Sequence, residues 1–136
     1  MMRLPVAIDP SVTLLVVRLV AGGIMMFYGW DKIKNPQANA RDFTDMGFKP
    51  GWLWGTLVLM TEFFGGLALL VGIFTQIAAL LILIHMSTGT IWKISTKRDF
   101  GDYTYDVLVA TLALVLLTYG PGPYAIESAP LWALSK

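Results

Sequence analysis

Three ionisable residues stand inside separate long apolar segments of the sequence: Arg18, Glu62 and His85. A charged side chain at the centre of a bilayer costs roughly 3 kcal/mol on insertion scales, so such residues are retained where they face one another, a hydrated cavity or a ligand. An imidazole beside a carboxylate can bind a ligand oxygen or shuttle a proton. The sequence therefore predicts a polar site in the interior of a helix bundle.

Four apolar segments must position these residues, and a membrane-spanning helix needs about 20 such residues. We expect a leader at 1–11 and an interfacial tail at 120–136, because prolines and glycines bound the apolar region at both ends. The fold class predicted is all-α, a polytopic membrane protein built as a four-transmembrane-helix bundle within 12–119. The four predicted spans are 12–30, 53–71, 77–92 and 103–119.

The composition supports a membrane protein and excludes several kinds of site. The chain is 56% hydrophobic and only 14% charged, whereas soluble domains carry about 25% charged residues. A net charge of +1 without a basic stripe argues against nucleic acid as a partner. Because the sequence has no cysteine, it holds no disulfide, cysteine-ligated iron–sulfur cluster or thiolate zinc site, and we predict no metal site. A redox role would then need a diffusible membrane carrier such as a quinone, or a cofactor held by another subunit.

Positive charge is distributed unequally between the two ends of the expected bundle. The loops at 31–52 and 93–102 carry seven lysines and arginines, whereas the opposite end carries Arg3 and Lys136. By the positive-inside rule, we expect the two charged loops in the cytoplasm and both termini outside.

Helical spacing places the buried polar residues on faces that also carry small residues. Arg18 shares a face with Gly22, and Glu62 shares a face with Gly65, which is typical of helix-packed inner faces. At 1.5 Å per residue, Arg18, Glu62 and His85 lie ~9, ~13 and ~12 Å from the outer ends of their helices. We therefore expect a buried Arg18–Glu62 ion pair. His85 is expected to bond to Glu62, shuttle a proton or bind a ligand oxygen.

Two interpretations of this cluster stay open. The pair marks a ligand or proton site, or it only fixes the register of the helices. Asp106 lies ~20 Å from the outer end of the last span, and we read it first as a helix N-terminal charge favoured by the dipole. Its neighbour Tyr105 is either an interfacial anchor or a hydrogen-bond donor to a headgroup.

Motifs along most of the chain resemble one known family, the DoxX family of small four-helix integral membrane proteins. The resemblance covers roughly residues 12–127. Tyr28 stands where the family often has histidine, and Asp106 and Glu127 stand where it usually has Glu and Asp. The matching residues are Arg18-Leu19, Gly22, Phe27, Gly29 and Lys32; residues 62–75 (EFFGGLALLVGIFT) with Ala78-Ala79; Tyr105-Asp106; Gly120-Pro121-Gly122; and Ala125-Ile126-Glu127.

The resemblance implies a function, because the family takes its name from a membrane subunit of an archaeal thiosulfate:quinone oxidoreductase. Other members are tied to oxidative stress or sulfur metabolism. The leading hypothesis is therefore a membrane subunit of a quinone-linked oxidoreductase or respiratory-type assembly in a prokaryotic plasma membrane. Two alternatives remain: a non-catalytic accessory subunit, and a small transporter or lipid- or anion-binding protein. The expected partners are the lipid bilayer and other membrane subunits or a second copy of the chain.

On the leading hypothesis, the buried polar residues are the predicted catalytic residues. Arg18 offers a positive end to a quinone oxygen or a sulfur oxyanion and is paired with Glu62. His85 hands protons to the reduced carrier, and Asp106 provides an exit towards the cytoplasm. The quinone is expected to contact Arg18, His85, Gly22 and Gly65.

Overall fold

The computed structural model describes residues 8–127, which contain five α-helices and no strand. Four of the helices, all except the second, are long and apolar enough to cross a membrane. The predicted all-α membrane bundle is confirmed. Most of the predicted leader 1–11 and the end of the predicted tail 120–136 lie outside the described residues. The helices are α1 (Pro10–Lys34), α2 (Pro36–Asp45), α3 (Gly51–Val71), α4 (Thr75–Ser95) and α5 (Phe100–Tyr119).

Local sequence signals set the ends of the long helices. Helix α1 begins at Pro10, and the Asp9 carboxylate accepts a hydrogen bond from the backbone N–H of Ser11 at 2.9 Å. Helix α3 ends at Val71 and is capped by Gly72, whose φ of 75° is the left-handed conformation that glycine adopts without strain. The chain then turns within three residues into α4, so α3 and α4 are antiparallel neighbours.

Helix α2 lies in the segment that the sequence indicated as a polar connection. Its first turn is capped by Asn35, whose side-chain oxygen accepts from the N–H of Ala38 at 3.1 Å. The buried Asn39 side chain donates to the carbonyl of Gly55 at 2.9 Å, which fastens α2 to the start of α3. This short helix therefore covers one end of the bundle.

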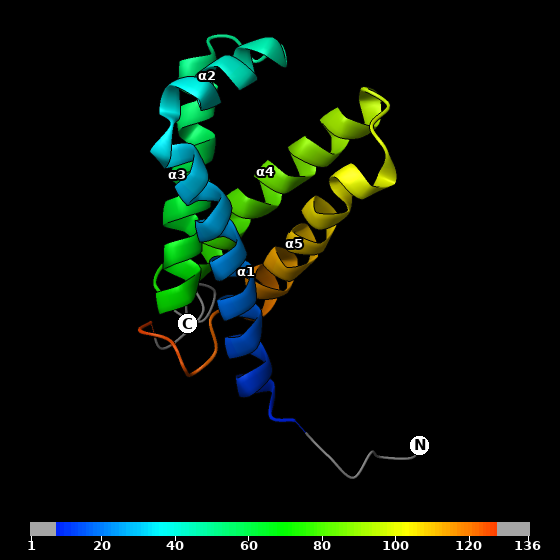
Figure 1. Cartoon of the computed structure of the whole chain (residues 1–136). Coiled ribbons are helices and arrows are strands. Elements are labelled where there is room, and N and C mark those ends of the chain that lie inside the picture. Colours follow the sequence, from blue (N-terminus) through cyan, green and yellow to red (C-terminus); the bar gives the residue numbers. More distant parts are fainter. Residues whose placement is uncertain (1–7, 128–136) are drawn as a thin grey trace.

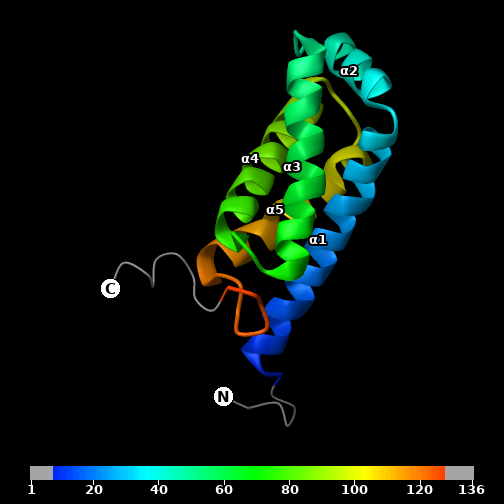
Figure 2. The same ribbon diagram turned by 90° about the vertical axis from the view of Figure 1, so that its left-hand side faces the viewer.

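The long helices pack as two pairs, α1 with α3 and α4 with α5. Backbones approach closely in the first pair: a Cβ on Gly22 would lie only 2.7 Å from the carbonyl oxygen of Gly66. The two pairs diverge towards the end that carries α2 and the α4–α5 loop (Figure 1). The start of α1 and the segment 120–127 lie at the opposite end (Figure 2).

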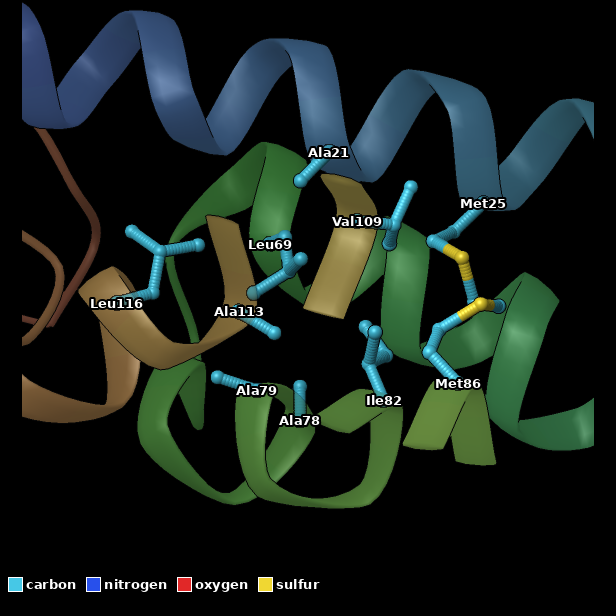
Figure 3. Close-up of a cluster of buried hydrophobic side chains, with 10 residues drawn as sticks. All are labelled: Ala21, Met25, Leu69, Ala78, Ala79, Ile82, Met86, Val109, Ala113 and Leu116. Carbon is cyan, nitrogen blue, oxygen red and sulfur yellow. The ribbon is translucent and has the colours of Figure 1, made fainter. Parts of the chain in front are cut away.

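The apolar core lies where the two pairs meet (Figure 3). The alanines of α4 and α5 allow those helices to approach closely, and Met25 and Met86 extend towards each other across the interface between the pairs. Polar residues are therefore displaced to the two ends of this core. Its members are Ala21, Met25, Leu69, Ala78, Ala79, Ile82, Met86, Val109, Ala113 and Leu116.

Candidate functional site

A cavity of about 540 Å³ opens between the two helix pairs at the α2 end of the bundle. This volume falls within the range of about 300–1,000 Å³ that is typical of small-molecule sites. All five helices contribute to its walls, which are mostly apolar. Its ionisable residues in the long helices are Lys32, Glu62, His85, Lys93 and Asp106, together with two tyrosines.

Glu62 is the centre of the first polar group in this cavity. Its carboxylate is only 3% exposed, and its two oxygens bind residues from different helices. Oε2 accepts from Nζ of Lys32 at 2.6 Å, and Oε1 lies 2.9 Å from Nε2 of His85. One carboxylate thus joins α1, α3 and α4. Bonding of His85 to Glu62 was one of the three arrangements expected from the sequence.

The hydrogen-bond chemistry of Glu62 determines which tautomer of His85 is present. An ionised carboxylate only accepts hydrogen bonds, so the Nε2 atom of His85 carries the proton that points at Oε1. In a neutral ring, Nδ1 is then an acceptor that can take up a second proton. Glu62 and His85 therefore form a unit that can hold and release a proton inside an apolar cavity.

A second carboxylate group lines the same cavity. The Asp106 side chain is 5% exposed, and its Oδ2 atom accepts from Nζ of Lys93 at 2.8 Å. Gly89 makes room for it, because a Cβ there would lie 3.3 Å from this oxygen. Our first interpretation of Asp106 as a helix N-terminal charge is wrong, since Asp106 lies beyond the first turn of α5, where the dipole effect has declined. Burial instead requires that it have a cationic partner.

Aromatic rings close the side of the cavity between α1 and α5. The rings of Tyr28 and Tyr105 lie 5.0 Å apart between centroids, and Lys93 lies over the Tyr105 ring at 5.9 Å. Both tyrosines line the cavity. Tyr105 is therefore a wall of the site.

The charges of the two buried pairs balance. Lys32 neutralises Glu62, and Lys93 neutralises Asp106, so a neutral His85 leaves the two buried pairs without net charge. The exposed side chain of Asp42 also lines the cavity and adds a negative charge there. Such a site suits a neutral, hydrogen-bonding head group better than an anion.

Arg18 lies outside this site, and the predicted Arg18–Glu62 ion pair is wrong. Its side chain is almost fully buried at the opposite end of the core, and within residues 8–127 the guanidinium donates to four backbone carbonyls. Two of the acceptor carbonyls, those of Leu69 and Leu70, belong to the last turn of α3, where carbonyls lack intrahelical partners. The acceptors are the carbonyl oxygens of Leu69 at 3.0 Å, Leu70 at 3.2 Å, Pro121 at 3.0 Å and Tyr124 at 2.8 Å.

The error has a physical cause in the relative heights of the helices. The estimate of depth assumed that α1 and α3 end at the same level. Arg18 instead lies level with Leu69, which is seven residues, or about 10 Å, along α3 from Glu62. The first two turns of α1 thus extend past the end of α3, where the segment 120–127 folds back and provides acceptors. Arg18 fastens this segment to the bundle and does not face the cavity, so it offers no positive end to a ligand there.

The two glycines predicted to contact a quinone are helix-packing positions. Gly22 lies against the backbone of Gly66, and a Cβ on Gly65 would lie 3.4 Å from a methyl group of Ile82. Neither glycine lines the cavity. Close helix approach accounts for both glycines, and their assignment as cofactor-binding residues stays a prediction.

Lys32 and Lys93 were not placed in the site from the sequence: both were counted as loop charges, and Lys32 was otherwise named only among the residues that resemble the family. A signal for Lys32 was present: it lies three residues after Gly29, on the inward face of α1 that also carries Arg18 and Gly22. Lys93 likewise follows Gly89 by four residues on the inward face of α4. Both side chains are about a quarter exposed, so they reach from the membrane end into the cavity.

Comparison with known proteins gives one match. The sequence model of the DoxX family matches residues 13–94, which contain Arg18, Lys32, Glu62, His85 and Lys93. Comparisons with curated proteins and with solved structures give no match. The match thus includes the whole Glu62 group and ends before Asp106.

Proposed function

Because the chain belongs to the DoxX family, whose model matches more than half of its residues, we propose that it is an integral membrane subunit of a quinone-linked oxidoreductase. In this proposal a quinone head group binds in the cavity beside Glu62 and His85. The charged loops face the cytoplasm of a prokaryotic cell, as the positive-inside rule predicts. The observation that carries the proposal is the buried carboxylate–imidazole pair at the wall of an apolar cavity.

The residues of the cavity fit a quinone head. Its carbonyl oxygens accept hydrogen bonds. The Lys32 ammonium has further N–H groups beyond the one bonded to Glu62, and His85 would donate from Nδ1 once its ring has taken up a second proton. Apolar and aromatic walls suit the ring. The balanced charge also favours this ligand over the anion-binding alternative, because a buried anion would need a cation that is not already paired.

The proposed role of this chain is to supply protons. Reduction of a bound quinone consumes two electrons and two protons, and the electrons would come from a partner subunit. His85 holds a proton next to Glu62, and Glu62 is linked through Lys32 to the polar end of α1. Asp106 and Lys93 form a second proton-holding pair in the same cavity, so they would connect the site with the cytoplasmic side.

The first experiment asks whether the subunit and its ligand can be isolated together. The tagged protein is purified in mild detergent, and co-purifying proteins and lipids are identified by mass spectrometry. A stoichiometric partner that carries a redox cofactor, together with bound quinone, is the expected result. A stoichiometric partner with no quinone on this chain would support the accessory-subunit alternative.

The second experiment tests the proton role within that isolated complex. Glu62→Gln keeps the size of the side chain but removes its ability to ionise, so we expect quinone-dependent turnover to be lost while the complex stays assembled. The matched control is Glu127→Gln, a carboxylate at the other end of the bundle whose oxygen accepts from the N–H of Thr75. Wild-type turnover in the Glu62 variant would remove the proton role from the proposal.

A further inference from the structure

The cavity is open on one side of the bundle, between α3 and α4. The aliphatic residues that line it there are about half exposed: Leu57 is 51%, Leu81 49% and Ile84 55% exposed. All three lie in helices that can span the membrane. The inside of the cavity is therefore continuous with the surface that faces the hydrocarbon chains of the lipids.

Side chains and helix α2 narrow the other approaches to the cavity. Tyr28 and Tyr105 close the side between α1 and α5 through their ring contact. Helix α2 and the loop after it cover the end, where Asn39, Phe43 and Phe48 contribute to the lining. Because Asn39 is hydrogen-bonded to α3, this cover is fixed in place.

The rim between α3 and α4 offers little to a hydrated molecule. Its hydroxyl groups belong to Thr61 and Thr88, and each already donates to a carbonyl of its own helix at 2.8 Å. The rim extends along α4 from Leu81 to Trp92, a length of about 16 Å. An apolar chain can lie along such a rim while its polar head lies at Glu62.

We propose that the cavity takes up its ligand sideways from the bilayer, through an opening between α3 and α4 bounded by Leu57, Leu81 and Ile84. The ligand class is a lipid-soluble molecule with a neutral hydrogen-bonding head and a long apolar tail that stays against this opening. The inference rests on the proposed function for the choice of a quinone head. The lateral route is an independent claim, based on the lining and exposure of the three aliphatic residues.

Photolabelling tests the route in protein reconstituted into phosphatidylcholine nanodiscs. The probe is a decyl-tailed azidobenzoquinone, and the labelled peptides are mapped by mass spectrometry. The double variant Leu57→Trp/Ile84→Trp narrows the opening. The matched control, Met60→Trp/Leu80→Trp, places the same two rings on the same helices at residues that are 46% and 43% exposed and do not line the cavity.

The expected result is strong labelling of α3 and α4 in the wild-type protein. Labelling falls at least ~10-fold in the narrowed variant, equivalent to about 1.4 kcal/mol, and stays within ~2-fold in the control. Equal labelling of the narrowed and control variants would overturn lateral entry but leave quinone binding intact. A wild-type protein that takes no label would overturn the proposed function instead.

A second measurement tests the route without a quinone. Because the sequence has no cysteine, Thr61→Cys carries a single spin label. We expect oxygen, which concentrates in hydrocarbon, to relax this label strongly, and a water-soluble nickel chelate to relax it weakly. Stronger relaxation by the nickel chelate would show that the opening faces water and would refute the lateral route, whatever the ligand.

Discussion

Loss of Lys32 should destabilise the bundle more than loss of any exposed lysine. The Nζ atom of Lys32 lies 2.6 Å from Oε2 of Glu62, a separation at which the direct attraction is about 6 kcal/mol at an effective dielectric constant of 20. Desolvation of both groups offsets much of that attraction. Removal of one partner from a buried pair nevertheless costs about 3–5 kcal/mol, because the other charge is left unpaired. For Lys32→Met we expect a loss of ~3 kcal/mol in the free energy of unfolding.

The two partners should differ in their single-variant costs. Glu62→Gln leaves a lysine whose side chain is 27% exposed and can turn towards water, so we expect a loss of ~1.5 kcal/mol. The double variant Lys32→Met/Glu62→Gln leaves no charge unpaired and should lower the free energy of unfolding by ~2 kcal/mol. The double-mutant cycle therefore has a coupling energy of ~2.5 kcal/mol.

The assay is unfolding by SDS in mild detergent, followed by far-ultraviolet circular dichroism. Lys34→Met is the matched control, because Lys34 is paired with Asp31 at 3.5 Å and both side chains are more than half exposed. Such surface pairs contribute about 0–1 kcal/mol. If Lys32→Met were no more destabilising than Lys34→Met, or if the costs of the double variant were additive, the buried pair would not be formed.

Three further predictions follow from other contacts. Arg18→Met should lower the free energy of unfolding by ~3 kcal/mol and speed hydrogen exchange in the segment 120–127. Arg18→Lys should be intermediate, because an ammonium cannot reproduce the guanidinium fork. Unchanged exchange in Arg18→Met would contradict the assigned contacts. Gly22→Ala should lower the free energy of unfolding by ~1–3 kcal/mol, because the added methyl group pushes α1 away from α3. In Gly23→Ala the methyl group meets open space, so this control should be neutral or stabilising by up to ~1 kcal/mol. Equal effects of the two variants in SDS unfolding would refute the close approach of the helices. Lys93→Met should lower the free energy of unfolding by ~3 kcal/mol, because it leaves Asp106 unpaired. The double variant Lys93→Met/Asp106→Asn should restore stability, which SDS unfolding would check.

The fold was predictable because its signals are local. Apolar runs of nearly 20 residues mark spanning helices whatever the rest of the chain does. Helix α2 was missed because its ten residues are mostly polar and carry no such run, and it is held by a long-range contact between Asn39 and Gly55. The contact of His85 with Glu62 was among the expected arrangements, since both lie on small-residue faces of neighbouring helices.

The partner of Arg18 was not predictable in the same way. Residue spacing gives the height of a side chain along its own helix, but it does not give the offset between two helices. That offset is set by the segment 120–127, whose backbone N–H groups at Ile126 and Glu127 donate to the carbonyls of Val71 and Gly72. Residues more than 100 positions from Arg18 in the sequence thus provide two of its acceptors, so carbonyl oxygens and not the Glu62 carboxylate face Arg18.

The two polar groups make the ends of the bundle physically different. At the end near Arg18, a charge is satisfied by carbonyl dipoles that cannot ionise, and these bonds hold α1, α3 and the segment 120–127 together. At the other end, both charges of each pair belong to side chains, and the Glu62 pair is bonded to an imidazole that can exchange a proton. A change of protonation at His85 therefore alters contacts at the end where the helix pairs diverge, whereas the carbonyl contacts of Arg18 stay the same. The end near Arg18 fixes the positions of the helices, so a change of protonation at His85 acts on the cavity without loosening the fold.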